Sequence, residues 1–137
     1  MRYDVLPALT PFNRAWFTSG ALAVQQCPSC RVFQHPPEEL CHRCGTFDLE
    51  TEVLAPTGHV HSYTVVHHAA RPQLSDAVPY AVLLVALDQA PDVRVVADLV
   101  NGDPHGVYIG MPVEAVWTDH HLDGETIRLP HWRPADL

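Results

Sequence analysis

All four cysteines of the chain lie in one eighteen-residue window and form two Cys-x-x-Cys pairs. The first pair is Cys27 and Cys30, the second is Cys41 and Cys44, and ten residues separate them. In such a pair the backbone amides point at the thiolates, and two pairs together supply a tetrahedral set of four sulfur ligands. The spacing predicts a structural Zn²⁺ site with no coordination position left open for catalysis.

Three other states of the cysteines share this spacing. Two disulfides would require an oxidising compartment, and the N-terminus, which carries Asp4 and lacks a long apolar stretch, does not resemble a secretory signal. A mononuclear iron uses the same four sulfur ligands as zinc, and unmetallated thiols hold no ion at all. We predict zinc in a cytoplasmic protein, with iron and free thiols as alternatives.

Positive charge gathers beside these cysteines. Arg31 and Arg43 adjoin or lie within the two pairs, and Phe33 and His35 lie in the segment between them. The chain has no lysine, so a phosphate would have to be bound by arginine, which contacts it through two parallel hydrogen bonds. Balancing the negative charge of zinc held by four thiolates would equally explain both arginines. The sequence leaves both interpretations open.

Length and charge exclude several classes of protein. The 137 residues fit one ordinary domain or a small domain with an appendage, and the absence of lysine excludes Schiff-base chemistry and a P-loop. The formal net charge is −8, and residues 46–137 carry only four arginines against thirteen acidic residues. This charge disfavours nucleic-acid binding, which needs several basic contacts. The longest apolar run, residues 78–87, is too short to span a membrane.

The cysteines must be positioned by the elements around them. Thr10 as an N-cap, Pro11 at the first helical position and Gly20 as a stop predict a short helix over residues 11–19. Phe12 and Trp16 share one face of this helix, which is too short to be stable alone. It must dock on the body of this protein or on a partner.

The sequence after residue 45 is typical of an all-β structure. Runs rich in Val, Thr, Leu and Tyr alternate with turn signals, and residues 93, 95, 97 and 99 form one apolar face. Five or six short strands that hide their edges suggest a small barrel of the OB-fold type. We expect strands over residues 48–54, 58–67, 80–87, 93–100, 112–118 and 126–129.

The predicted fold is therefore mainly β. It comprises an N-terminal helical segment over residues 1–21, a four-cysteine zinc ribbon over residues 22–46, and a five- to six-stranded OB-fold barrel over residues 47–137.

No catalytic residue is predicted. Motifs of the Gly-x-Ser-x-Gly and His-Glu-x-x-His types are absent, as are Gly-rich phosphate loops. Asp98 and Glu114 occupy alternating strand positions that are usually solvated. The ten histidines do not predict a second metal site, because adjacent pairs such as His120 and His121 point to opposite faces of a strand.

The order of parts resembles a known family. A short aromatic helix, a four-cysteine ribbon with the sequence FQHPP at residues 33–37, and a small barrel are similar to the acyl-CoA-associated family that joins an N-terminal rubredoxin-like zinc ribbon to a C-terminal OB-fold. The resemblance covers nearly the whole chain. Its further matches are GHVHSYTVV at residues 58–66, VPY at 78–80, IGMPV at 109–113 and LPHWRP at 129–134.

The resemblance implies a non-catalytic accessory subunit. Members of this family act as partners of thiolase-fold enzymes, among them thiolases, polyketide-type acyltransferases and acyl-CoA aldolases. The partner supplies the catalytic residues, and the ribbon and barrel stabilise it and help to shape its acyl-CoA site. The alternatives are a nucleic-acid-binding zinc ribbon and OB module, an iron-loaded electron carrier, and a free-standing enzyme.

The residues of the ribbon and the helix supply a hypothesis for the contacts. We expect Arg31 and Arg43 to lie nearest the phosphates of acyl-CoA, with Phe33 and His35 packing on the carrier or on the partner. We expect Phe12 and Trp16, together with the ribbon, to form the partner interface.

Overall fold

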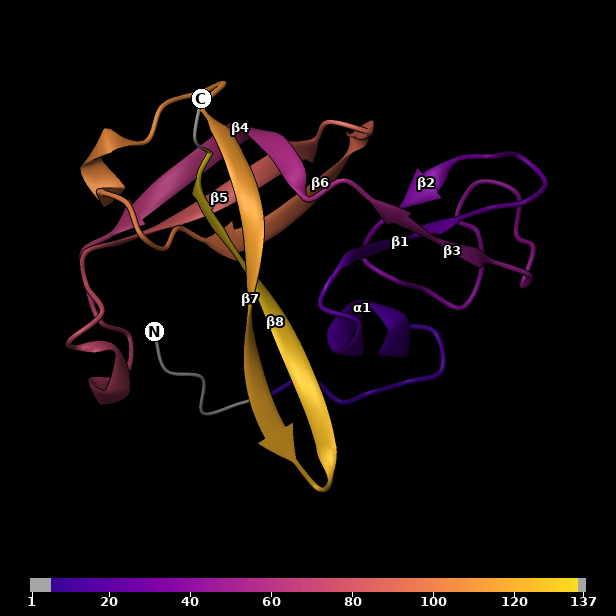
Figure 1. Cartoon of the computed structure of the whole chain (residues 1–137), viewed down its shortest axis with the longest axis horizontal. Helices are drawn as coiled ribbons and strands as arrows, with labels where there is room; N and C mark the ends of the chain where they lie inside the picture. Colours follow the sequence, from indigo (N-terminus) through magenta and orange to yellow (C-terminus); the bar gives the residue numbers. More distant parts are fainter. Residues whose placement is uncertain (1–5, 136–137) are drawn as a thin grey trace.

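The computed structural model describes residues 6–135 and contains two antiparallel sheets (Figure 1). The smaller sheet has the order β2-β1-β3 and is built from β1 (Leu22–Gln26), β2 (Phe33–Gln34) and β3 (Glu50–Leu54). The larger sheet has the order β6-β5-β4-β7-β8. Its strands are β4 (Thr57–Val66), β5 (Tyr80–Leu87), β6 (Ala90–Asp98), β7 (Pro112–Leu122) and β8 (Glu125–Pro134).

The helix α1 (Arg14–Thr18) is shorter than the predicted helix over residues 11–19. Residues 11–13, which follow Thr10, form a turn that precedes the helix. The Asn13 N–H donates a hydrogen bond to Thr10 Oγ1 at 3.2 Å, and the Thr10 N–H donates to Asn13 Oδ1 at 2.7 Å. This reciprocal pair holds residues 11–13 in a turn. Gly20, with φ at +65°, ends the segment as predicted.

The strand β3 belongs to the ribbon sheet. It was expected to be the first strand of the barrel, but it pairs along its length with β1, beginning with Leu22 opposite Leu54. Both of these side chains are buried in the core. The barrel therefore has five strands, and the predicted boundary between residues 46 and 47 precedes a strand of the smaller sheet.

The five-stranded sheet closes on itself as an OB-fold barrel, which confirms the predicted fold class. Strand β4 bends at a bulge between Val60 and Ser62 and pairs with both β5 and β7. A parallel bridge between Leu99 and Trp132 joins the end of β6 to β8, and the Val100 N–H donates to the Trp132 carbonyl at 2.7 Å. Closure thus brings the ends of two strands that are distant in sequence side by side.

The hairpin of β7 and β8 is longer than the predicted strands 112–118 and 126–129. Its two-residue turn consists of Asp123 and Gly124, both with positive φ, as a type I′ turn requires. The hairpin extends past the other strands and lies beside α1 (Figure 1). Arg128 donates a hydrogen bond to the Thr18 carbonyl, and Arg14 pairs with Glu125 at 3.0 Å.

One hydrophobic cluster joins the helix, the ribbon and the barrel. Trp16 of α1 and both Leu22 and Val24 of β1 belong to the same buried cluster as the inward-facing residues of the barrel. The predicted apolar face of β6 lies in this cluster, with Val93 and Val95 almost fully buried. Two short 3₁₀ turns, η1 (Pro72–Leu74) and η2 (Pro104–Gly106), occupy the loops. Within residues 6–135, no helix has the length and apolar character needed to cross a membrane.

Candidate metal centre and adjoining hollow

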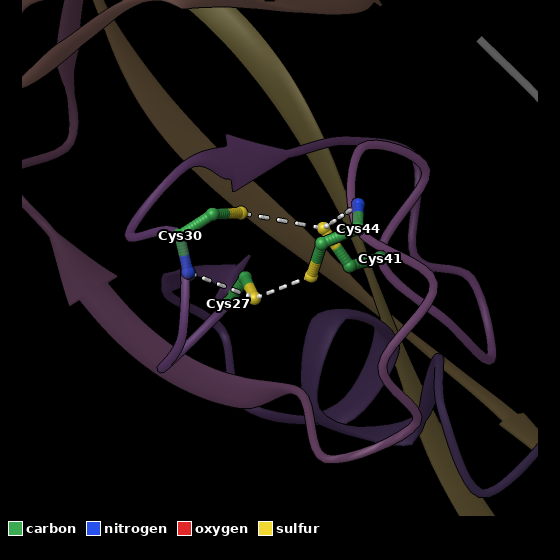
Figure 2. Close-up of side chains that lie close together, drawn as sticks. All are labelled: Cys27, Cys30, Cys41 and Cys44. Carbon is green, nitrogen blue, oxygen red and sulfur yellow. Dashed lines mark hydrogen bonds between the residues drawn. The ribbon is translucent and has the colours of Figure 1, made fainter.

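The four cysteines converge on one point (Figure 2). Their sulfur atoms all lie within 4.8 Å of one another, with 3.5 Å between Cys27 and Cys44 and 3.6 Å between Cys30 and Cys41. A tetrahedral Zn²⁺ with Zn–S bonds of about 2.3 Å separates its sulfur ligands by about 3.8 Å. All four are free thiols, so the structure does not contain the disulfides considered above. The donor set and its spacing fit a single metal ion.

In each Cys-x-x-Cys pair, here called a knuckle, a backbone N–H donates a hydrogen bond to the first cysteine. The Cys30 N–H donates to Cys27 Sγ at 3.4 Å, and the Cys44 N–H donates to Cys41 Sγ at 3.5 Å. Each bond stabilises the thiolate that accepts it. The bond from the Cys30 N–H lowers the pKa of Cys27 to about 6, and the bond from the Cys44 N–H lowers the pKa of Cys41. Because metals bind the thiolate, these bonds favour the form that a metal needs at Cys27 and Cys41, whereas the pKa of Cys30 and of Cys44 is raised in the metal-free cluster of thiols.

Both knuckles end in the same backbone geometry but with different residues. The Arg31 N–H donates to the Cys27 carbonyl at 2.9 Å, as the Gly45 N–H donates to the Cys41 carbonyl at 2.8 Å. Arg31 and Gly45 have φ values of +65° and +79°, a region that glycine adopts freely and other residues only at a cost. Arg31 therefore occupies a strained position that a glycine would fill without strain.

A buried glutamine pair holds the segment between the knuckles. Gln25 and Gln34 lie opposite each other in β1 and β2 and are both buried. The Gln25 side chain bonds both backbone groups of Glu38, and Gln34 Oε1 accepts from the His42 N–H at 3.1 Å. Neither glutamine is among the residues predicted from the sequence, because their contact depends on the pairing of β1 with β2.

A hollow of about 480 Å³ lies between the ribbon and the barrel. Arg31, Phe33 and His35 line it from the ribbon, so three of the four residues predicted to contact acyl-CoA lie together. Arg43 is exposed and is not part of this lining. His42, which the prediction missed although it lies between two predicted ligands, also lines the hollow. The barrel wall comprises Gln89, Ala90, Pro91, Asp92 and Val93.

His35 is a neutral side chain packed on Trp16. The two rings are 4.2 Å apart between centroids, and His35 Nδ1 is buried without a hydrogen-bond partner among the described residues. Burial lowers the pKa of His35 to about 4, so the ring carries no charge near neutral pH. Its contribution to a binding site is therefore packing or hydrogen bonding rather than charge.

The two aromatic residues predicted at a partner interface have different environments. Trp16 is only 4% exposed and packs in the core, so the expectation that its side chain contacts a partner is wrong. Docking within the chain, the other prediction for this helix, accounts for it. Phe12 instead lines a second hollow of about 420 Å³ together with Phe47, whose side chain is 70% exposed.

The expectation that Asp98 is solvated is also wrong. Its side chain is buried, and Oδ1 lies 2.6 Å from His131 Nδ1. Barrel closure causes this contact, because it places the end of β6 beside β8. Glu114 is half-buried and pairs with Arg133 across β7 and β8.

Two family models match consecutive parts of the chain. The model described as the rubredoxin-like zinc ribbon domain of ChsH2 matches residues 18–50, and the one described as the C-terminal OB-fold domain of ChsH2 matches residues 51–118. The two matches follow the order of the smaller sheet and the barrel.

Individual proteins show the same likeness. The chain is 39% identical over 132 residues to a probable enoyl-CoA hydratase alpha subunit of Thermomonospora curvata, covering 94% of this chain but only 39% of that protein. It is 32% identical over 101 residues to a DUF35 domain-containing scaffold protein of Methanocaldococcus jannaschii, covering 73% of this chain and 70% of that protein. A solved structure described as the Ltp2-ChsH2(DUF35) aldolase contains a chain with a TM-score of 0.77 and 37% identity, covering 94% and 98% of the two chains.

Proposed function

Because the chain belongs to the ChsH2 family, which joins a rubredoxin-like zinc ribbon to an OB-fold, we propose that it is an accessory subunit of an acyl-CoA-processing enzyme. In this proposal it acts in the cytoplasm, binds a thiolase-fold enzyme and helps to form that enzyme's acyl-CoA site. The observation that carries the proposal is the likeness over 98% of a chain in the Ltp2-ChsH2(DUF35) aldolase structure.

The metal in this proposal is structural zinc. Cys27, Cys30, Cys41 and Cys44 would hold it, and a site closed by four protein ligands fixes the ribbon without taking part in a reaction. The ion would tie the loop before β2 to the loop before β3, and so set the positions of Arg31 and His42 at the hollow.

The hollow between the ribbon and the barrel is the proposed contact with acyl-CoA. Arg31 is the cationic group in its lining and would bind a phosphate, while Phe33 and His35 would pack against the carrier or the partner. Asp92 on the barrel wall opposes an anion, so it should limit affinity. Arg43 lies outside this lining and would contact only a phosphate that extends beyond the hollow.

The proposed partner surface lies on the ribbon. Phe12 and Phe47 line one hollow, and Val53 of β3 is 64% exposed. Exposed aromatic and aliphatic side chains of this kind are enriched where one protein binds another.

Co-purification tests the partner. The tagged chain, expressed in its own host, should retain a thiolase-fold enzyme in stoichiometric amount, and the same sample should contain one zinc ion per chain. Phe47→Asp should release the enzyme, whereas Ile109→Asp, which changes a residue of similar exposure in a barrel loop, should not. A zinc-containing chain that stays alone would overturn the proposal.

Titration of the purified complex with CoA tests the ligand contact. Arg31→Gly should weaken binding about tenfold or more, since hydrogen bonds to charged groups contribute about 1.5–3 kcal/mol. Asp92→Asn should strengthen binding. Equal affinity in all three proteins would remove the hollow from the proposal and leave the partner assignment to the co-purification.

A further inference from the structure

A chain of hydrogen bonds runs from the inside of the barrel to its surface through three strands. Asp98 of β6 lies 2.6 Å from His131 of β8, measured from Oδ1 to Nδ1. His131 Nε2 lies 2.8 Å from Oγ1 of Thr118 on β7, and the same oxygen lies 2.8 Å from His120 Nε2. Asp98 and His131 are 8% and 3% exposed, whereas Thr118 is exposed.

One assignment of the two histidine ring protons gives each group in this chain a donor or acceptor role. In this assignment the Asp98 carboxylate accepts, so His131 donates its Nδ1–H to Asp98 and presents a lone pair at Nε2. The Thr118 hydroxyl then donates its one proton to His131 Nε2 and accepts a hydrogen bond from the Nε2–H of His120. An accessible hydroxyl is thereby bonded to an imidazole base, and a buried carboxylate orients that base.

We propose that Thr118, His131 and Asp98 form an acyl-transfer site in which Thr118 accepts an acyl group from an ester or thioester. A nucleophile within hydrogen-bond reach of a base, and a third group orienting that base, is the arrangement that activates hydroxyl nucleophiles on unrelated folds. Thr118 and His131 are the catalytic residues, and Asp98 is a positioning residue.

The step conserves atoms and electrons. Thr118 Oγ1 forms a bond to the acyl carbon while its proton passes to His131 Nε2. The bond from the acyl carbon to the leaving oxygen or sulfur then breaks, and the leaving group takes the proton from His131. The products are acylated Thr118 and an alcohol or thiol. A water molecule that gives its proton to His131 Nε2 then attacks the acyl carbon, the bond to Thr118 Oγ1 breaks, Oγ1 takes the proton back, and a carboxylic acid is released.

An apolar hollow lies beside this triad. It has a volume of about 460 Å³, and its lining includes Asp98, Trp16, Phe17, Val96 and Leu129. Asp98 is the member of the triad that lines this hollow, and Leu129, which also lines it, pairs directly with Thr118 between β7 and β8. Apolar walls favour a substrate with a hydrocarbon acyl chain. The substrate class follows from this geometry and does not depend on the proposed partner.

The test uses the full zinc-loaded chain alone with p-nitrophenyl butyrate as the acyl donor. Release of p-nitrophenolate should accompany the gain of one butyryl group, and peptide mapping should place that group on Thr118. Thr118→Val should abolish both signals, and Thr118→Ser should restore them. Thr126→Val is the matched control, because Thr126 also bonds a histidine of the hairpin, His121 Nδ1 at 3.2 Å, and its loss should change nothing.

The role of Asp98 has its own readout. Asp98→Asn should lower kcat about 10³- to 10⁴-fold with KM unchanged, as expected when the imidazole is held in the wrong tautomer. A butyryl group on another residue, or an undiminished rate in Thr118→Val, would overturn the proposal. Since no partner is present in this assay, its outcome is separate from that of the co-purification.

Discussion

The side-chain amides of Gln25 and Gln34 face each other across β1 and β2, and Gln34 Nε2 donates a hydrogen bond to Gln25 Oε1 at 3.0 Å. Gln34 also donates to the Leu40 carbonyl and accepts from the His42 N–H. Two buried amides thus replace the regular backbone pairing that the segment between the knuckles lacks. They connect the metal centre to the sheet beneath it.

Gln34→Leu should lower the free energy of unfolding by about 2–4 kcal/mol, because it leaves buried hydrogen-bonding groups without partners. Urea denaturation of the zinc-loaded protein measures this. Gln26→Leu, one position along β1 from Gln25 and bonded at the surface to the Arg31 carbonyl, should cost less than about 1 kcal/mol. Equal losses in the two variants would contradict a special role for the buried pair.

Removal of zinc by a strong chelator should increase hydrogen exchange of the backbone amides of β1 and β3, because binding of a structural metal is coupled to the folding of its ligand loops. The central barrel strand β5 should stay protected. Measurement of exchange before and after chelation gives the comparison, and readdition of zinc is the control. Unchanged exchange in β1 would show that the ribbon does not depend on the metal.

Arg31→Gly should raise the free energy of unfolding by about 0.5–1 kcal/mol, because glycine adopts the positive φ of this position without strain. The same change should weaken CoA binding, so stability and affinity should move in opposite directions. Arg43→Gly is the control, because Arg43 is not among the described non-glycine residues with positive φ and should not gain stability. Thermal unfolding of both variants decides the matter.

His35 should make the protein less stable as the pH falls from about 6.5 to about 4. Burial lowers the pKa of His35 from 6.5 to about 4, so in this interval the unfolded chain takes up a proton that the folded chain does not. The expected loss between pH 7 and pH 5 is about 1–2 kcal/mol. His35→Phe should remove this part of the pH dependence, whereas His42→Phe, at an exposed position, should retain it.

Gly58→Ala should destabilise the barrel by at least about 2 kcal/mol. A Cβ at Gly58 would lie 2.5 Å from both the Ala86 carbonyl oxygen and Val85 Cγ1, where β4 crosses close to β5. Gly106→Ala is the control, because its Cβ would meet only Asp103 Cβ at 3.7 Å. Similar denaturant midpoints for the two variants would show that β4 can move away from β5.

Local features were predictable from the sequence, and features that depend on barrel closure were not. The two cysteine pairs, and Arg31 with Phe33 and His35, lie within one short ribbon, so spacing alone placed them together. Asp98 and His131 meet only because β6 and β8 close the barrel, and no spacing reveals this contact. Likewise, the burial of Trp16 in this chain's own core was one of two outcomes that its helix pattern allowed.

The extent of the hairpin was missed for a different reason. Residues 119–122 are mostly polar and do not alternate in the way that predicts a strand, so β7 was expected to end at residue 118. Asp123 and Gly124 are nevertheless a typical signal for a two-residue hairpin turn. A two-residue hairpin turn at Asp123 and Gly124 predicts one strand that ends at residue 122 and another that begins at residue 125.

The hydrophobic cluster shared by Trp16, Leu22 and the barrel limits how the ribbon and the barrel of different relatives can be combined. A chimera that took its ribbon from one relative and its barrel from another would have to repack that interior, whereas transfer of helix, ribbon and barrel together would not. The three parts therefore share one interior, and a substitution in one of them bears on the packing of the others.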